Sequence, residues 1–311
     1  MIHAVLEGGG AAVGISDLMN VFGGLRFYTH ALAAGLKPIL GCDLKVINPK
    51  DLNKPFRLGV LCMNHEGYHS LSVLLTKAFL TNNDAARGLV DPKWFDDGGS
   101  EGLIALSGAA QGELGSLLLG KKWALAHEAA ERFKAQFPGR FYVELQRAGR
   151  PTDELATARL ANFAVDEKLP VVATHPIQFL KPEDFEAHEV RCSIAEGYTL
   201  QDPRRVKRYT PEQYLKSEAE MCELFADIPA AIENTVEIAK RCNLDGVLSK
   251  PQLPLFPTPD GMSLDDYIDQ LSKEGLQKRL EFLYPDPKVL EERRPPYDKR
   301  LEYELGIIKG M

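Results

Sequence analysis

Short apolar runs alternate with amphipathic stretches between residues 10 and 200. Six of these runs lack regular polar alternation, at residues 11–15, 38–41, 58–62, 102–106, 141–145 and 170–174. Continuous apolar runs of this length predict strands that are buried on both faces. Strands that alternate with helices predict an α/β fold with a largely parallel sheet, and the regular alternation favours a barrel over an open sheet.

Apolar residues spaced three or four positions apart predict the helices. One predicted helix carries Leu114, Leu117, Leu118, Leu125, Ala129 and Phe133, and another carries Leu155, Ala158, Ala161 and Val165. A third stretch has the same spacing at Met221, Leu224, Ile228, Ile232, Val236 and Ala239. Pro229 lies inside this stretch, and proline is favoured at the first position of a helix, so we expect two packed helices here.

The pattern changes after Asn243. Residues 250–259 hold four prolines in ten positions, which excludes regular helix and predicts an extended connector. Ser263 is placed to cap a following helix, with Asp265 and Asp266 in its first turn. We expect residues 290–311 to be interrupted by prolines.

Composition and charge narrow the function classes. The chain has 311 residues, of which 26% are charged and 44% hydrophobic, as in an ordinary globular protein. A net charge of −7 argues against a free-standing, high-affinity nucleic-acid binder, because phosphate contacts need clustered cations. The one basic cluster, at residues 204–208 (Arg-Arg-Val-Lys-Arg), is interpreted as a solvated loop and not as a phosphate track.

No apolar run approaches the roughly 20 residues that a membrane span requires, and no signal peptide is visible. The five cysteines are dispersed and odd in number. This argues against a disulfide framework and predicts a reducing, cytoplasmic environment.

Two short motifs suggest chemistry that their context does not support. His65-Glu66-Gly67-Tyr68-His69 matches the His-Glu-x-x-His pattern of zinc peptidases, which requires both histidines on one helix. We expect the helix to begin only near Gly67 and Tyr68, and to bury Leu71, Leu74, Leu75 and Phe79. Residues 8–10 (Gly-Gly-Gly) precede a strand and lack a Lys-Ser/Thr partner, so they are interpreted as the end of a helix and not as a phosphate loop.

Four segments match one known family in order and at the family's spacing. They are residues 187–191 (Ala-His-Glu-Val-Arg), 214–218 (Tyr-Leu-Lys-Ser-Glu), 221–229 and 234–243. The chain resembles the PHP (polymerase and histidinol phosphatase) domain of the C-family of bacterial replicative polymerases, the DNA polymerase III alpha subunits. The resemblance implies a distorted (βα)7-like barrel whose first strand precedes Met1. The strand at 11–15 should therefore lack one neighbour, and residues before it should be mobile or rearranged.

The resemblance also divides the chain. It implies an N-terminally truncated PHP domain at 1–249, a proline-rich connector at 250–262 and a helical segment at 263–311. Residues 295–305 are similar to the entry of the polymerase palm.

Active PHP domains resemble metal-dependent phosphoesterases, with His, Asp, Glu and Cys ligands at the carboxyl ends of the strands. In this chain the matching segments are 16–20, 41–43, 107–109, 146–149 and 174–178. At or beside the positions where active relatives place metal ligands, this chain has Asp17, Leu18, Asp43, Ala109, Ala148, Pro176 and Gln178. Only Asp43 keeps an oxygen ligand, with Asp17 beside it, so we expect no metal, cofactor or catalytic residue in this chain. His175 is interpreted as a hydrogen-bonded residue at a strand end, and His188 as a packed helix residue.

The resemblance implies an N-terminal fragment of a replicative polymerase, inactive by itself. The parent would perform template-directed DNA synthesis with Mg²⁺ held by palm carboxylates, and would meet DNA and dNTP through its other parts. The PHP part would be structural and metal-free, and would help to dock the proofreading exonuclease alongside other replicase subunits. The alternative is a PHP-type phosphoesterase or pyrophosphatase with residual metal binding.

Overall fold

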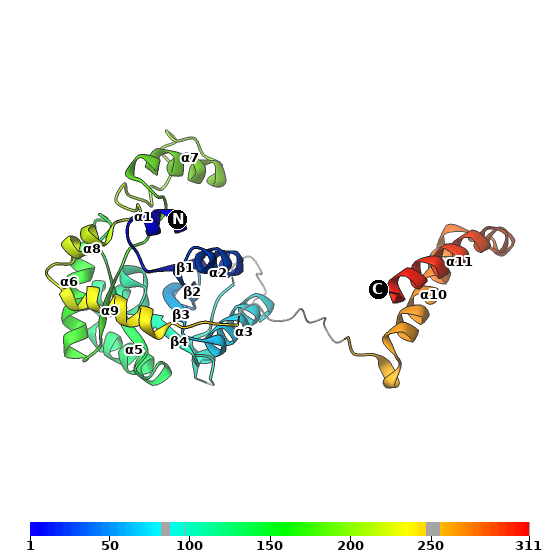
Figure 1. The fold of residues 1–311 in the computed structure, drawn as a ribbon, viewed down its shortest axis with the longest axis horizontal. Helices are drawn as coiled ribbons and strands as arrows, with labels where there is room; N and C mark the ends of the chain where they lie inside the picture. Colours follow the sequence, from blue (N-terminus) through cyan, green and yellow to red (C-terminus); the bar gives the residue numbers. More distant parts are fainter. Residues whose placement is uncertain (82–87, 97, 247–255, 311) are drawn as a thin grey trace. The chain divides into compact units, whose positions relative to one another are not determined.

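The computed structural model describes residues 1–81, 88–96, 98–246 and 256–310. The chain divides into two compact units, Met1–Leu248 and Ser249–Met311 (Figure 1). The first unit holds the sheet and the candidate site, and the second is helical.

One sheet organises the first unit. Its six strands are β1 (Ala12–Leu18), β2 (Lys37–Val46), β3 (Phe56–Cys62), β4 (Leu103–Leu106), β5 (Phe141–Gln146) and β6 (Val171–Thr174). They lie side by side in chain order. All six strands coincide with the predicted apolar runs, and the sheet curls into part of a barrel, which confirms the predicted α/β class.

The strand directions are more mixed than the sequence predicted. The pairs β1–β2, β4–β5 and β5–β6 are parallel, whereas β3 is antiparallel to both β2 and β4. No helix separates β2 from β3, and a connection without a crossover returns the chain in the opposite direction. Among the described residues, β1 forms one edge of the sheet and pairs with β2 alone, as predicted.

Nine α-helices surround this sheet in the described part of the first unit. They are α1 (Ile2–Glu7), α2 (Gly24–Ala33), α3 (His65–Thr81), α4 (Glu113–Leu119), α5 (Trp123–Gln136), α6 (Asp153–Asp166), α7 (Phe185–Glu196), α8 (Glu218–Leu224) and α9 (Pro229–Arg241). Helix α9 begins at Pro229, as predicted. None of the described helices of the chain combines the length and apolar character needed to cross a bilayer.

The predicted helix through Leu114 and Phe133 is two helices. Lys121, between α4 and α5, has a left-handed backbone with φ of 56°. At the break the Lys121 N–H donates to the Leu118 carbonyl at 3.0 Å, and the Arg159 guanidinium of α6 donates to the carbonyls of Leu118 (2.8 Å) and Leu119 (3.1 Å).

Helix α6 buries a different face from the one predicted, and α9 departs from its prediction at one residue. In α6, Leu155 and Val165 are 50% and 77% exposed, and the buried residues are Asp153, Ala156, Thr157, Leu160, Phe163 and Ala164. In α9, Val236 is 53% exposed, whereas Ile232 and Ala239 pack against buried residues as predicted. Apolar residues occur on both sides of α6, so spacing alone did not identify its buried side.

The N-terminal residues form a helix. Helix α1 ends at Glu7, and residues 8–10 separate it from β1, which confirms the interpretation of the three glycines. Ile2 packs against the hydrophobic core. The expectation that residues before Ala11 are mobile or rearranged stays a prediction.

The second unit contains α10 (Leu264–Leu283) and α11 (Pro287–Lys309). Ser263 caps α10 as predicted, because its hydroxyl accepts a hydrogen bond from the Asp266 N–H at 3.1 Å. The predicted interruption of residues 290–311 was wrong, since α11 continues through Pro295 and Pro296. Most of the proline-rich stretch at 250–259 lies outside the described residues.

Contacts with α10 compensate for the two prolines in α11. The Arg294 guanidinium donates to the Gln277 side chain, and the Lys309 ammonium donates to Asp269 at 2.9 Å. These contacts hold α11 on both sides of the proline pair, where backbone hydrogen bonds are lost.

Candidate functional site

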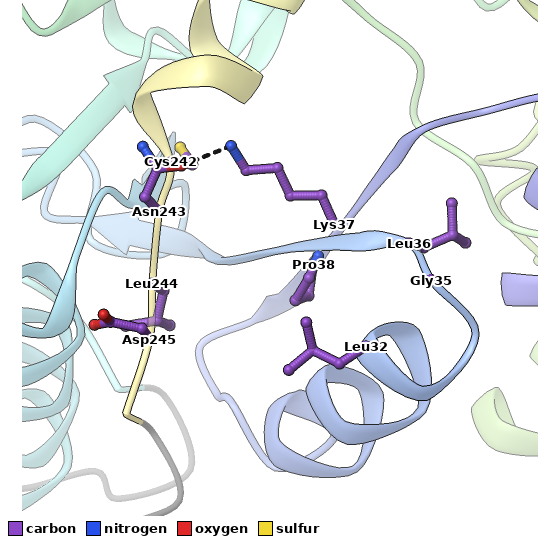
Figure 2. Close-up of a pocket in the computed structure, with 9 residues that line it drawn as sticks. All are labelled: Leu32, Gly35, Leu36, Lys37, Pro38, Cys242, Asn243, Leu244 and Asp245. Atoms are coloured by element: carbon purple, nitrogen blue, oxygen red, sulfur yellow. Dashed lines mark hydrogen bonds between the residues drawn. The ribbon is translucent and has the colours of Figure 1, made fainter.

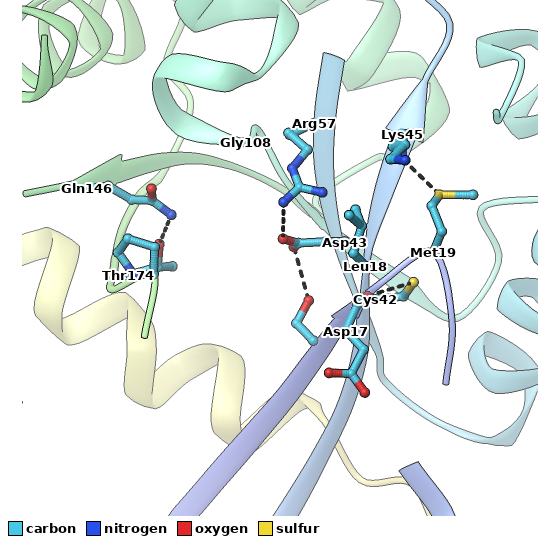
Figure 3. Close-up of polar contacts among 12 residues, drawn as sticks. Asp17, Leu18, Met19, Cys42, Asp43, Lys45, Arg57, Gly108, Gln146 and Thr174 are labelled. Carbon is cyan, nitrogen blue, oxygen red and sulfur yellow. Dashed lines mark hydrogen bonds and ion pairs between the residues drawn. The ribbon is translucent and has the colours of Figure 1, made fainter. Parts of the chain in front are cut away.

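The sequence-predicted positions lie at or just after strand ends, and Figure 3 shows three of them, Asp17, Leu18 and Asp43, at one end of the sheet. Asp17 and Asp43 lie near the carboxyl ends of the parallel strands β1 and β2. Since β3 is antiparallel, its first residues return to the same end, and Arg57 pairs in register with Lys45. The turn after β4 and the ends of β5 and β6 complete this end of the sheet.

Asp43 is held by protein groups. The Ser16 hydroxyl donates to its Oδ1 at 3.1 Å, and the Arg57 guanidinium lies 3.4 Å from its Oδ2. Burial raises the pKa of the Asp43 carboxyl, and the Arg57 cation partly offsets that effect. An arginine therefore provides the positive charge next to the one carboxylate that matches a ligand position.

Strand β1 contains no histidine or cysteine that could act as a metal ligand next to Asp43. Leu18, at the position of a family histidine, is 42% exposed. The backbone oxygen of Asp17 accepts a hydrogen bond from the Cys42 thiol at 3.2 Å. Burial raises the pKa of Cys42 to about 12, so this thiol stays protonated and is a poor metal ligand.

Ala109 and Ala148 are both buried. Ala109 and the preceding Gly108 have left-handed backbones, with φ of 46° at Ala109 and 78° at Gly108. The Ala148 N–H donates to Asp153 Oδ2 at 2.7 Å, and its carbonyl accepts from the Thr210 hydroxyl. These two positions therefore contribute packing and backbone contacts, and neither offers a side-chain donor atom.

The last predicted segment is tied to the loop before α8. The Gln213 side-chain amide donates to the Pro176 carbonyl at 2.9 Å, and the Gln178 N–H donates to the Gln213 carbonyl at 2.8 Å. The Gln178 side chain is exposed. Both positions therefore serve backbone contacts in this chain.

The two histidines of this region behave as predicted. His175 Nε2–H donates to the Glu212 carbonyl at 2.7 Å, and burial lowers the pKa of His175. His188 is buried, with its ring 5.6 Å from that of Phe179 and 4.7 Å from that of Tyr209. One histidine is hydrogen-bonded at a strand end, and the other is packed among aromatic rings.

Glu144 is a site residue that the sequence reasoning missed. It lies on β5, is 7% exposed, and burial raises its pKa. Its Oε2 accepts from the Gly108 N–H at 2.9 Å, and its Oε1 accepts from the Gln146 amide at 3.0 Å and from the Thr174 hydroxyl. The available signal was a lone charged residue in the otherwise apolar run at 141–145.

The His-Glu-x-x-His stretch lies on a helix after all. Helix α3 begins at His65, so His65 and His69 occupy one helix, and the expected start near Gly67 was wrong. Phe79, which was expected to be buried, is 39% exposed, whereas Leu71, Leu74 and Leu75 are buried. Among the residues that the structure describes, no group of three or more His, Cys, Asp or Glu residues is placed to hold a metal ion.

The basic cluster at 204–208 is divided between surface and interior. Arg204 has 75% of its side chain exposed and pairs with Asp202 at 2.7 Å. Arg205 has only 4% exposed and pairs with Glu189 of α7 at 2.5 Å. The interpretation as a solvated loop therefore holds for Arg204 and was wrong for Arg205.

A cavity of about 470 Å³ lies at the other end of the sheet (Figure 2). It is lined by the end of α2, the start of β2 and residues 242–245. The Lys37 ammonium crosses to Asn243 Oδ1 at 2.8 Å. The cavity is thus separate from the candidate site.

Comparison with known proteins agrees with the geometry. Residues 1–148 match the family model described as PHP domain. The chain is 47% identical over 313 residues to the DNA polymerase III subunit alpha of Neisseria meningitidis serogroup B, a match that covers 100% of this chain and 27% of that protein. It is 43% identical over 311 residues to the subunit of Vibrio cholerae, with the same coverage, and 45% identical over 300 residues to that of Escherichia coli K12, with 96% and 26% covered.

Strands β1 to β5 therefore lie within the part of the chain that matches a PHP domain. The chain belongs with the alpha subunits of DNA polymerase III and matches their N-terminal region. It spans about 27% of the length of these relatives.

Proposed function

We propose that this chain supplies the PHP domain of a DNA polymerase III alpha subunit and acts there as a metal-free structural domain. The observation that carries this proposal is the 47% identity over the whole chain to an alpha subunit. In the complete enzyme, template-directed DNA synthesis would use Mg²⁺, DNA and dNTP at other parts of the subunit. Such an enzyme would work in the bacterial cytoplasm.

The contacts at the strand ends support a metal-free role. Metal ligands are usually carboxylates, imidazoles or thiolates with free lone pairs. Asp43 is engaged by Arg57 and Ser16, and Glu144 accepts three hydrogen bonds from protein groups. These two carboxylates are therefore satisfied by protein groups.

The domain would brace the polymerase and help to dock the proofreading exonuclease and other replicase subunits. A replacement experiment tests the first role. The matching region of the Escherichia coli alpha subunit is exchanged for this chain, and primer extension by the purified chimera is measured. We expect synthesis near that of the parent subunit, whereas a subunit from which the same region is deleted should be unstable or inactive.

The docking role is tested separately, by gel filtration of the chimera with the exonuclease subunit. Co-elution is expected, and a well-folded, active chimera that elutes without the exonuclease would contradict docking. The alternative of a phosphoesterase predicts stoichiometric bound metal and hydrolysis of a phosphodiester by the chain alone.

A further inference from the structure

The cavity between the end of α2 and residues 242–245 has a largely apolar lining. Its volume of about 470 Å³ lies within the range of small-molecule sites. The exposed Leu32 forms its outer wall, and its other apolar lining residues are buried, namely Leu36, Pro38, Cys242 and Leu244. A cavity with these walls favours a ligand that has an apolar body.

Hydrogen bonds hold both sides of this cavity in place. The Tyr28 hydroxyl of α2 donates to the Leu244 carbonyl at 3.1 Å, and the Asn243 N–H donates to the Met63 carbonyl at 2.7 Å. Residues 242–245 are thus tied to α2 on one side and to the end of β3 on the other. The cavity is therefore preformed, as small-molecule sites usually are.

The Lys37 ammonium lies beside the cavity without a counterion. It donates to Asn243 Oδ1 at 2.8 Å, and none of the carboxylates in the described part of the chain pairs with it (Figure 2). The ammonium has further N–H groups that can donate to a ligand. Figure 2 shows the Asp245 carboxylate on the side of residues 242–245 that faces away from Leu32 and Pro38. The cavity therefore combines apolar walls with a positive charge.

We propose that this cavity binds a small monocarboxylate with a short apolar tail. The tail lies against Leu36, Pro38 and Leu244, and the carboxylate accepts a hydrogen bond from the Lys37 ammonium. A single ammonium suits a monoanion, whereas phosphate sites usually combine arginines with the backbone N–H groups of a helix N-terminus. The proposal does not depend on the polymerase assignment.

Titration of the whole chain with octanoate, followed by NMR of its leucine methyl groups, tests the proposal. The signals of Leu32, Leu36 and Leu244 should shift together, with a dissociation constant of about 0.1–1 mM. Octylamine has the same tail and a positive head group, so it should bind at least about tenfold more weakly.

Three results of this titration would overturn the proposal. The first is the absence of binding at octanoate concentrations about tenfold above the expected dissociation constant. The second is a set of shifts confined to leucines outside the cavity, and the third is equal binding of octanoate and octylamine.

Variants at Lys37 test the role of the ammonium. Lys37→Met removes the charge and keeps an apolar stem, so it should weaken octanoate binding about tenfold to a hundredfold. Lys37→Arg keeps a cation and should bind octanoate more tightly than Lys37→Met. Lys240→Met, at an exposed lysine of α9, is the matched control and should leave the dissociation constant unchanged.

Circular dichroism must show that each variant is folded. A folded Lys37→Met variant that binds octanoate as tightly as the unaltered chain would overturn the proposal. If Lys37→Met does not fold, the comparison of octanoate with octylamine on the unaltered chain decides.

Discussion

The contacts of Asp43 show how protein groups stabilise a partly buried carboxylate. A carboxylate that is partly removed from water needs a positive charge or hydrogen-bond donors nearby. Arg57 supplies the charge at 3.4 Å, and Ser16 supplies a donor at 3.1 Å. The arginine comes from β3, whose antiparallel direction brings its start to this end of the sheet. Compensation at this residue therefore depends on the reversed strand.

His175 should make the stability of the fold sensitive to acid. Its Nε2–H bonds the Glu212 carbonyl, while its buried Nδ1 has no partner, and burial lowers its pKa. Lys216 and Arg150 further oppose a positive charge on the ring. A lowered folded-state pKa means that the stabilisation is present above the unfolded-state pKa of about 6.5 and is lost as pH falls through the folded pKa.

We therefore expect the free energy of unfolding to fall below about pH 6.5, and the fall to be shallower in His175→Gln. One proton changes this slope by at most about 1.4 kcal/mol per pH unit. Urea unfolding at a series of pH values measures it, with the exposed His69→Gln as the matched control. Identical slopes for His175→Gln and the unaltered chain would refute this role, although His188, whose pKa is also lowered, keeps part of the slope.

At the candidate site, the sequence predicted where residues lie in the sheet better than it predicted which side chains contact each other. Leu18, Ala109 and Ala148 stand at strand ends as expected from the aligned motifs. Arg57 and Glu144 could not be assigned, because each acts through contacts that span 14 to 36 residues of sequence. Such contacts depend on strand order and direction, which periodicity does not contain.

At the scale of elements, Arg147 joins the end of β5 to the corner between α8 and α9. Its guanidinium donates to the Leu224 carbonyl at 2.6 Å and to both Asp227 oxygens at 2.6 and 2.8 Å, and it lies over the Phe225 ring. Only 14% of its side chain is exposed. Removing it would leave the partly buried Leu224 carbonyl without this donor.

Arg147→Ala should therefore lower the free energy of unfolding by about 2 kcal/mol. Arg204→Ala is the matched control, since it also removes a pair with two hydrogen bonds to an aspartate, but at a side chain that is 75% exposed. We expect a loss within about 0.5 kcal/mol for this control. Chemical denaturation of both variants checks the difference, and equal losses would show that Arg147 does not link these elements.

Gly67 sets how closely the start of α3 approaches the turn before β4. A Cβ at Gly67 would lie 2.0 Å from the Gly102 carbonyl oxygen, a contact that only backbone movement could relieve. Gly67→Ala should cost about 2–3 kcal/mol. Gly24→Ala in α2, where a Cβ would meet no atom closer than 3.6 Å, should change stability by less than about 1 kcal/mol. Thermal unfolding compares the two, and a harmless Gly67→Ala would mean that α3 can shift away.

The elements themselves were predicted unevenly. Apolar runs identified all six strands, because strands buried on both faces leave a strong signal. The break at Lys121 and the continuity of α11 through Pro295 were missed. In both places a side chain of another helix makes a contact. Arg159 donates to the Leu118 carbonyl at the break, and Gln277 accepts a hydrogen bond from the Arg294 side chain just before the prolines. The outcome therefore depended on tertiary contacts.

At the scale of the whole molecule, the curled sheet is a scaffold that collects distant residues at one end. Glu144 accepts hydrogen bonds from Gly108 and Thr174, which come from distant segments of the chain. Asp43 lies at the same end of the sheet and accepts a hydrogen bond from Ser16. In a metal-dependent enzyme such an end would leave lone pairs for metal ions. In this chain protein groups donate to Glu144 and to Asp43, which supports the proposal of a sheet that keeps its shape without a metal.

A site whose carboxylates are satisfied by protein groups predicts that the stability of the fold does not depend on metal ions. A ligand that binds only the folded state at a hundredfold above its dissociation constant adds about 2.7 kcal/mol, which raises the melting temperature of a domain this large by several degrees. We expect melting in EDTA and in added Mn²⁺ or Zn²⁺ to agree within about 1 °C, and elemental analysis after dialysis to find no stoichiometric metal. Asp43→Asn distinguishes metal binding at the site from metal binding at the protein surface. A metal-dependent shift of the melting temperature that persists in this variant arises from binding elsewhere. Two or more ions per chain, with a melting temperature that falls in EDTA only while Asp43 is present, would restore the metal-dependent interpretation of the site.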